Sequence, residues 1–225
     1  MKAGIAAISR HRIVVDGDGV NTLVAFMGCP LRCRYCLNPQ TLSPDSPHRK
    51  MTPADLYEET KKDELYFLAT GGGVTFGGGE PLLRPDFIRD FRSLCGAGWK
   101  INAETSLNVP RENIMALMPV IDHWFIDIKD MDPVIYRSYT GRDNAGVRDN
   151  LRLLADAGLA ARCTIRIPHI PGYNGEADRD RSIKELKAIG FRVFDRFEYK
   201  TDIDGKRKRN MPDPQGDQKA DCQSE

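Results

Sequence analysis

In the stretch TLVAFMGCPLRCRYC, residues 22–36, a run of β-type residues leads directly into three closely spaced cysteines. Cys29, Cys33 and Cys36 have the spacing CxxxCxxC. A cubane iron–sulfur cluster usually takes four thiolates, so these three would leave one iron without a protein ligand. An iron left open in this way is available to bind another molecule. The spacing therefore indicates a reactive cluster rather than one that only carries electrons.

Two other uses of the cysteines fit the sequence less well. A structural zinc site takes four ligands, typically from two CxxC or HxxxH pairs, and the remaining cysteines are isolated: Cys95, Cys163 and Cys222. The triad cannot pair off in disulfides, and nothing that resembles a secretory segment precedes it. Free thiols are the default in a reducing compartment, so we expect a cytoplasmic protein.

Composition predicts one folded domain without a nucleic-acid or membrane partner. The chain has 225 residues, of which 40% are hydrophobic, enough for a proper core. Lysine and arginine number 33 against 32 aspartates and glutamates, and no apolar run approaches the length of a membrane span. We expect a monomer with an N-terminal extension over residues 1–21 leading into the barrel, a core domain over 22–200 and a polar, flexible tail over 201–225.

Six β-type runs alternate with helical patterns. The runs are TLVAFM at 22–27, VTF at 74–76, KINA at 100–103, WFIDI at 124–128, RCTIRI at 162–167 and RVFDRF at 192–197. Helices are predicted over residues 52–69, from Pro85, after Pro110, over 147–157 and over 178–189. Cys95 falls on the apolar stripe of the helix from Pro85, which indicates a core residue.

Strand–helix alternation with short connections predicts parallel strands and right-handed crossovers. Six such units are too few for a closed eight-stranded barrel. We therefore expect an α/β fold with a partial, open (β/α)6 TIM-like barrel.

Reactive side chains or glycines end or follow each of the six runs. In chain order they are GCPLRCRYC, GGGEP, ETS, the Asp127/Lys129 pair, Arg166 and Tyr199/Lys200. The carboxyl ends of parallel strands gather at one edge of such a barrel. Filling of the core does not explain charged and glycine-rich segments at all six places, so we predict that they share one pocket.

Four segments together resemble the radical S-adenosylmethionine (SAM) superfamily: GCPLRCRYCLNP, VTFGGGEPLL, DIKDMD and IPGYN. Within it they look most like the activating enzymes of glycyl-radical enzymes, of the pyruvate formate-lyase activating type. The resemblance implies a [4Fe–4S] cluster and SAM as cofactors, and reductive cleavage of SAM to a 5′-deoxyadenosyl radical. In such an enzyme the radical abstracts hydrogen from a glycine of a partner glycyl-radical enzyme.

The resemblance also implies roles for residues of this chain. Cys29, Cys33 and Cys36 would hold three irons of the cluster. Contacts with SAM are implied for Tyr35, Asn38, Gly78, Gly79, Glu80, Glu104, Asp127, Lys129 and Arg166. A monovalent cation beside the SAM carboxylate is implied for Glu104, Thr105 and Asp127, because carboxylate oxygens suit a hard ion. Tyr199 or Lys200 would substitute near the adenine, where the family has a PYH-like element and this chain reads FEYK.

Several of these residues also have a purely structural interpretation. Tyr35 suits the core of the cysteine loop, and Glu80 suits the surface. Asp127 with Lys129 suits a surface ion pair, and Arg166 suits a structural pair at the barrel mouth. Three positions depart from the family pattern: Leu37 stands in place of a His, Glu104 in place of an Asp, and Leu107 in place of a Gly.

Fold and cofactor alone do not fix the substrate, so two other functions stay open. One is a radical SAM enzyme that modifies another peptide or a small molecule. The other is an iron–sulfur electron carrier or scaffold, which would leave GGGEP, the Asp127/Lys129 pair and Arg166 unexplained. No further cysteine cluster follows Cys36, so the electron has to come from an external donor such as flavodoxin or ferredoxin.

Overall fold

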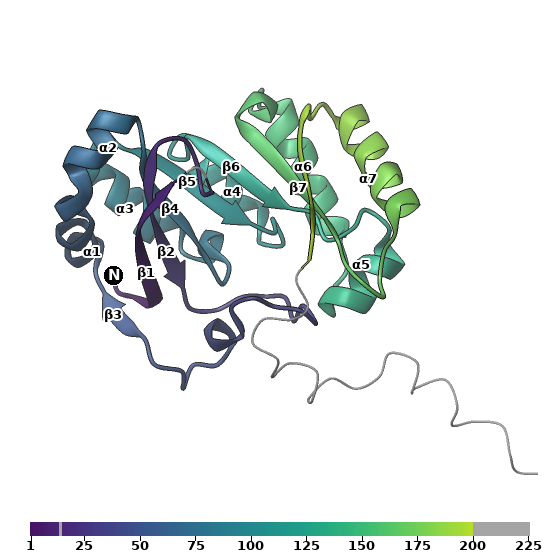
Figure 1. The fold of residues 1–225 in the computed structure, drawn as a ribbon, viewed down its shortest axis with the longest axis horizontal. Helices are drawn as coiled ribbons and strands as arrows, with labels where there is room; N and C mark the ends of the chain where they lie inside the picture. The colour runs from purple at the N-terminus through teal and green to yellow at the C-terminus, as the bar shows by residue number, and fades with distance from the viewer. Residues whose placement is uncertain (14, 200–225) are drawn as a thin grey trace, which may run out of the picture.

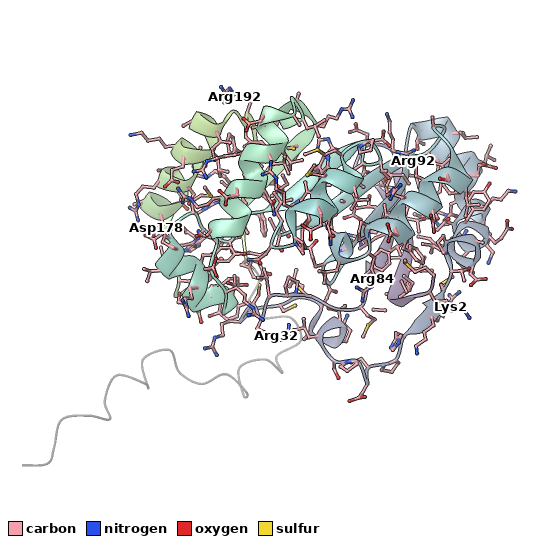
Figure 2. The ribbon with its side chains drawn as sticks, turned by 180° about the vertical axis from the view of Figure 1, so that it is seen from behind. Lys2, Arg32, Arg84, Arg92, Asp178 and Arg192 are labelled. Atoms are coloured by element: carbon pink, nitrogen blue, oxygen red, sulfur yellow. The ribbon has the colours of Figure 1, made fainter. Side chains whose placement is uncertain are left out.

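A curved, mostly parallel sheet of eight strands forms the centre of the molecule (Figure 1). The computed structural model describes residues 1–13 and 15–199. The strand order is β3-β1-β2-β4-β5-β6-β7-β8. Most helices lie behind the sheet in Figure 1 and in front of it in the reverse view of Figure 2. One face of the sheet is therefore covered by helices.

The six predicted strands are parallel neighbours in this sheet. They are β2 (Val20–Phe26), β4 (Gly73–Gly78), β5 (Lys100–Thr105), β6 (His123–Asp127), β7 (Cys163–His169) and β8 (Val193–Glu198). The α/β class and the partial, open barrel are thereby confirmed. All six strands end at the same edge of the sheet, where the predicted site residues are expected.

Two further strands extend the sheet by antiparallel pairing, which the sequence pattern did not predict. They are β1 (Ala3–Ile13) and β3 (Arg49–Met51). The pairing of β1 with β2 shifts register twice, and His11 has a φ of 57° near the second shift. Such irregularities disturb the alternation of buried and exposed side chains by which a strand is recognised. The extension over residues 1–21 thus contains a strand, and the division at residue 21 stays a prediction, as does the tail over 201–225, which lies outside the described residues.

The helix predicted over residues 52–69 is divided in the structure. Its parts are α1 (Pro53–Thr60), the 3-10 segment η2 (Lys61–Asp63) and α2 (Glu64–Thr70). Thr52 begins α1 with a capping box, since Asp55 N donates to Thr52 Oγ1 at 3.1 Å and Thr52 N donates to Asp55 Oδ2 at 2.8 Å. The Asp63 side chain in the 3-10 segment is fully buried. There it accepts hydrogen bonds from Arg10 and Thr22.

The other predicted helices are present, and one more appears. The predicted ones are α3 (Pro85–Cys95), α4 (Arg111–Leu117), α6 (Ala145–Asp156) and α7 (Glu176–Ile189). The additional helix is α5 (Pro133–Thr140), which Asp132 caps by accepting from the backbone N–H groups of Val134 and Ile135. Short 3-10 turns complete the connections: η1 (Pro39–Leu42), η3 (Pro81–Leu83) and η4 (Ala160–Arg162).

The hydrophobic core unites strand and helix side chains. Its fully buried members include Val24, Phe26, Phe76, Ile101, Ile126 and Ile165 from the strands and Phe87, Phe91, Leu151 and Leu154 from the helices. Burial of each such large side chain contributes about 1.5–3 kcal/mol. Cys163 is buried in this core, and Cys95 packs against it half-buried. None of the helices in the described part of the chain has the length and apolar character that a membrane span requires.

Candidate functional site

The loop that follows β2 carries the three cysteines and is tied to the far side of the sheet. Figure 1 shows this loop running from the end of β2 beneath the sheet towards α5. Arg32 N donates to Thr140 O at 2.9 Å, and Arg34 N donates to Tyr139 O at 3.2 Å. The loop therefore bridges the carboxyl ends of the strands. Its three cysteines are free and half-buried.

A cavity of about 680 Å³ lies at these strand ends. The predicted residues in its wall are Cys29, Cys33, Cys36, Asn38, Gly78, Gly79, Glu80, Glu104, Thr105, Asp127, Lys129, Arg166 and Tyr199. The predicted shared pocket is present, with members from every parallel strand or its following loop. Tyr35 is not part of this wall. Lys200 lies outside the described residues.

Two glycines at the end of β4 bring the cysteine loop against the sheet. A Cβ atom on Gly79 would lie 2.2 Å from the Gly28 carbonyl oxygen. Gly78 has a φ of 87°, and a Cβ there would lie 2.5 Å from the Ala25 Cβ. Asn38 Nδ2 donates to the Gly78 carbonyl oxygen at 3.4 Å. Close packing within the chain therefore explains why glycine stands at both positions, and the contact of these glycines with SAM stays a prediction.

Glu80 is a buried carboxylate held by neutral donors, with 1% of its surface exposed. Thr105 Oγ1 donates to Glu80 Oε1 at 2.7 Å. Ser106 donates to Glu80 Oε2 from its backbone N at 2.9 Å and from its Oγ at 2.7 Å. Burial raises the pKa of Glu80 above its ordinary value, although these donors oppose the rise. Neutral donors fix the carboxylate without cancelling its charge, so this side chain suits a cationic ligand.

Towards β6 and β7, two carboxylates are paired with cations. Arg166 Nη1 donates to Glu104 Oε1 at 2.6 Å, so the structural pair considered for Arg166 is present. Lys129 Nζ lies 3.6 Å from Asp127 Oδ2. Burial raises the pKa of Glu104, and Arg166 opposes that rise. Burial alone would lower the pKa of Lys129, but Asp127 and other neighbouring groups raise it above its usual range. Lys129 is therefore a charged, buried amine.

Tyr35 belongs to a cluster of aromatic rings beside the cavity. Its ring centre lies 6.0 Å from that of Tyr139, 5.9 Å from that of Tyr173 and 6.4 Å from that of Tyr199. The Tyr35 hydroxyl donates to the Pro171 carbonyl oxygen at 3.2 Å. These contacts fit the interpretation of Tyr35 as a core aromatic of the cysteine loop. Tyr199 belongs to the same cluster and also reaches the cavity wall.

The departures from the family pattern at two leucines have visible consequences. Leu37 lines the cavity with 49% of its surface exposed, so the expected imidazole is replaced by an apolar group. Leu107 is fully buried and has a φ of 55°. That backbone region favours glycine and costs other residues about 1–2 kcal/mol. The Leu107 N–H donates to Thr105 Oγ1 at 2.9 Å, which helps to hold the conformation.

Four polar residues of the cavity wall are not among the residues that the sequence predicts for the site: Arg12, Asp16, Ser106 and Asp195. Ser106 belongs to the ETS segment at the end of the third predicted strand, so its position was a usable signal. Asp195 shares one face of β8 with Phe197, because side chains alternate along a strand. Arg12 and Asp16 form an ion pair within β1 and its following loop, and no local pattern marks that pair as part of a site.

The donor set of the cavity fits a cubane cluster and SAM. Within residues 1–13 and 15–199, no three His, Cys, Asp or Glu side chains are placed to share one metal ion. A cubane cluster does not need that arrangement, because each thiolate binds a different iron. Burial, with Glu80 adding to it, raises the pKa of Cys29 to about 12, so cluster binding has to displace a proton there. Because Glu104 is already paired with Arg166, the monovalent cation stays a prediction.

Comparisons with known proteins agree with this geometry. The model of the family described as the Radical SAM superfamily matches residues 23–186. The match to the pyruvate formate-lyase-activating enzyme of Clostridium pasteurianum has 35% identity and covers 77% of this chain and 71% of that enzyme. The match to the indoleacetate decarboxylase activating enzyme of Tractidigestivibacter scatoligenes has 27% identity and covers 82% of this chain and 77% of that enzyme.

Among solved structures, Streptococcus suis SuiB bound to S-adenosylmethionine has a similar fold. Its TM-score is 0.62 at 14% identity, and the match covers 80% of this chain and 40% of SuiB. The chain therefore spans about two fifths of SuiB, and the likeness concerns the fold alone.

Proposed function

Because the chain belongs to the radical SAM superfamily and is an enzyme of its activating-enzyme type, we propose that it activates a glycyl-radical enzyme by removing a hydrogen atom from a glycine of that partner. When bound, a [4Fe–4S] cluster supplies one electron that cleaves SAM to a 5′-deoxyadenosyl radical, the hydrogen acceptor. The convergence of three thiols, Glu80 and the buried Lys129 on one cavity supports the radical chemistry. The 35% identity to the pyruvate formate-lyase-activating enzyme of Clostridium pasteurianum is the observation that favours a glycyl-radical enzyme as the partner.

The chain's own residues bind and orient the cofactors in this proposal. Cys29, Cys33 and Cys36 hold three irons, and the closely apposed loop and β4 fix their places. Glu80 binds the ammonium group of SAM, because its charge is not cancelled by a neighbouring cation. Lys129 attracts the SAM carboxylate.

The remaining predicted contacts complete the same cavity. Arg166 with Glu104 and Asp127 with Lys129 form its charged wall, and Asn38, Gly78 and Gly79 border the cysteine loop. The Tyr199 ring offers a flat apolar surface to the adenine. A monovalent cation beside Glu104, Thr105 and Asp127 would have to compete with the Arg166 guanidinium.

The setting of the enzyme follows from its thiols and its electron supply. All five cysteines of the described part of the chain are free thiols, which supports a reducing compartment such as the cytoplasm. An external donor such as flavodoxin or ferredoxin supplies the electron, and the enzyme acts as a monomer towards its partner.

A radical SAM enzyme that modifies another peptide or a small molecule is the second candidate, because the same cavity would serve it. An electron carrier is disfavoured, since it has no use for a buried carboxylate and a buried amine beside the cysteines.

Deuterium transfer tests the proposal. A candidate glycyl-radical enzyme containing α-deuterated glycine is incubated anaerobically with the reconstituted protein, SAM and reductant, and 5′-deoxyadenosine is analysed by mass spectrometry. The expected result is one deuterium per 5′-deoxyadenosine formed with the partner. Unlabelled 5′-deoxyadenosine with every candidate partner, together with deuterium transfer from a peptide or metabolite, would establish the second candidate instead.

A further inference from the structure

Four exposed arginines lie on the cysteine loop or on and just after α5, which the loop contacts: Arg32, Arg34, Arg137 and Arg142, here called the arginine patch. Figure 2 shows Arg32 at the edge of the molecule where this loop lies. Over the described part of the chain, ion pairs use other arginines, such as Arg12 and Arg166, and none uses these four. The patch is therefore a concentrated positive charge on a chain whose formal net charge is only +1.

Backbone contacts hold this charge against the loop without cancelling it. Arg32 Nη1 donates to the carbonyl oxygens of Cys29 and Leu31, both at 2.8 Å. Arg142 Nε donates to the Pro30 carbonyl oxygen at 3.2 Å. Carbonyl oxygens are neutral acceptors, so the guanidinium groups stay available to an anionic partner.

The end of α5 completes the patch. Gly141 follows Arg137 by one helical turn and therefore lies on the same face of the helix. A Cβ atom on Gly141 would lie 4.0 Å from the Arg32 Cβ. Asp143, the acidic neighbour of Arg142 in the sequence, accepts a hydrogen bond from Ala145 N, at the first residue of α6, at 3.2 Å.

The patch lies one residue away from the cavity. Arg32 and Arg34 flank Cys33, which reaches the cavity wall while both arginines are exposed. A protein bound to the patch would thus be separated from a cluster on Cys33 by the thickness of one loop. A substrate glycine, by contrast, has to enter the cavity on the inner side of that loop.

We propose that the arginine patch is the docking surface of the electron donor, an acidic one-electron carrier protein of the flavodoxin or ferredoxin type. The proposal rests on the proposed function, since it assumes a cluster on the three cysteines. In each docking event the reduced carrier loses one electron and the cluster gains it. Complementary charge accelerates such an encounter and makes it sensitive to salt.

Charge reversal of two patch residues tests the proposal. Arg34 and Arg137 are chosen because their side chains make no hydrogen bond in the described structure, unlike Arg32 and Arg142. The cluster-loaded R34E/R137E variant is mixed with reduced flavodoxin or reduced ferredoxin, and bleaching of cluster absorbance gives the reduction rate. We expect the rate to fall at least ~10-fold at low salt and the difference to shrink at high salt. R34K/R137K should keep most of the rate.

Two controls separate docking from damage to the cluster. R192Q removes an exposed guanidinium that is likewise held by carbonyl oxygens, those of Lys187 and Phe191, at the opposite edge of the molecule in Figure 2. It should leave every rate unchanged. Photoreduced deazariboflavin, a small uncharged reductant, should reduce the cluster of R34E/R137E as fast as that of the unaltered protein.

Other outcomes overturn the proposal. It is wrong if charge reversal leaves the rates with both carriers unchanged, or if neither carrier reduces the unaltered protein while deazariboflavin does. A loss of glycyl radical with deazariboflavin would instead assign the patch to the glycyl-radical enzyme. If no reductant yields 5′-deoxyadenosine, the proposed function fails, and salt-dependent binding of each carrier to the protein still decides whether the patch docks it.

Discussion

Two buried carboxylates at opposite ends of the parallel strands have the same charge and different surroundings. Asp63, near the start of β2, accepts from Arg10 Nε at 2.8 Å and from Thr22 Oγ1 at 2.9 Å. Burial alone would raise the pKa of Asp63, but these partners hold it below its ordinary value. Glu80, beyond the end of β4, has neutral donors, and burial raises its pKa. Asp63 is paired with a cation within the fold, whereas the hydrogen bonds that Glu80 accepts come from neutral donors.

Polar groups at the two ends of the parallel sheet also differ in what they contact. Polar groups at the amino ends of the strands join elements of the fold, as Asp63 joins β1 and β2 to η2. Groups at the carboxyl ends gather around the cavity. Variants at the amino ends should therefore lower stability at neutral pH, and variants at the carboxyl ends should weaken ligand binding.

The largest effect is expected for replacement of Cys33, with replacement of Cys95 as its control. Cys33 belongs to the cavity, whereas Cys95 ends α3 on the way into β5. The unaltered protein should bind about four irons per chain after anaerobic reconstitution. Cys33→Ala should abolish cluster binding, and Cys95→Ala should leave the iron content unchanged. Iron analysis and visible absorbance measure both, and equal losses would refute this assignment of the cysteines.

The next largest effects are expected for two isosteric variants, Glu80→Gln and Asp63→Asn. Glu80→Gln should weaken SAM binding about 100-fold, since a hydrogen bond to a charged group is worth about 1.5–3 kcal/mol. Asp63→Asn should leave SAM affinity unchanged and lower the free energy of unfolding by about 2 kcal/mol, because Arg10 loses its charged partner. Equilibrium dialysis with SAM and urea unfolding measure the two effects. If both variants lost the same property, the contrast between the two ends would be wrong.

The dependence of stability on pH should have opposite signs at the two carboxylates. Because the pKa of Asp63 is lowered in the folded state, its contribution is present above its unfolded pKa of about 3.9 and is lost as the pH falls. Because the pKa of Glu80 is raised, its contribution is present below its unfolded pKa of about 4.3 and is lost as the pH rises through the folded pKa.

Urea unfolding of the cluster-free protein over a pH series checks these signs. Asp63→Asn should flatten the acidic limb of the stability curve, and Glu80→Gln should flatten a decline above about pH 4.3. Identical pH curves for the two variants would contradict the opposite surroundings of the carboxylates.

The smallest expected effect concerns a donor to Glu80. Ser106→Ala removes the hydroxyl that donates to Glu80 Oε2 at 2.7 Å. Loss of this hydrogen bond should weaken SAM binding by about 1 kcal/mol, which corresponds to about 5-fold in affinity. Ser93→Ala, at an exposed serine of α3 that bonds the Arg89 carbonyl oxygen, is the matched control and should have no effect. An unchanged SAM affinity in Ser106→Ala would mean that Glu80 needs no such support.

Much of the fold and most of the site could be predicted from the sequence, because the signals are local. Alternating strands and helices with short connections indicate a parallel sheet, and the segments after its strands then meet at one edge. The same reasoning predicts that Cys33, Glu80 and Lys129 come together, as they do in the cavity wall. It also places Cys95 against the core, away from the triad.

The rest depends on contacts between distant segments. The antiparallel strand β1 is irregular in register, so its pattern does not mark it as a strand. The pairing of Arg166 with Glu104 joins residues on β7 and β5, which no spacing in the sequence relates. The helix α5 was recoverable in principle, because Asp132, Pro133 and Gly141 are its start and stop signals.

Electron paramagnetic resonance detects whether this enzyme places a radical on a glycine of another protein. The reconstituted enzyme is incubated with SAM, reductant and a candidate glycyl-radical enzyme. The control for each candidate is a variant in which its candidate glycine is changed to alanine. We expect a glycyl-radical signal on one partner, and this signal should disappear with the alanine variant and with Cys33→Ala of the activating enzyme. Turnover of SAM to 5′-deoxyadenosine with no radical on any partner, and with a peptide or metabolite altered instead, would contradict it.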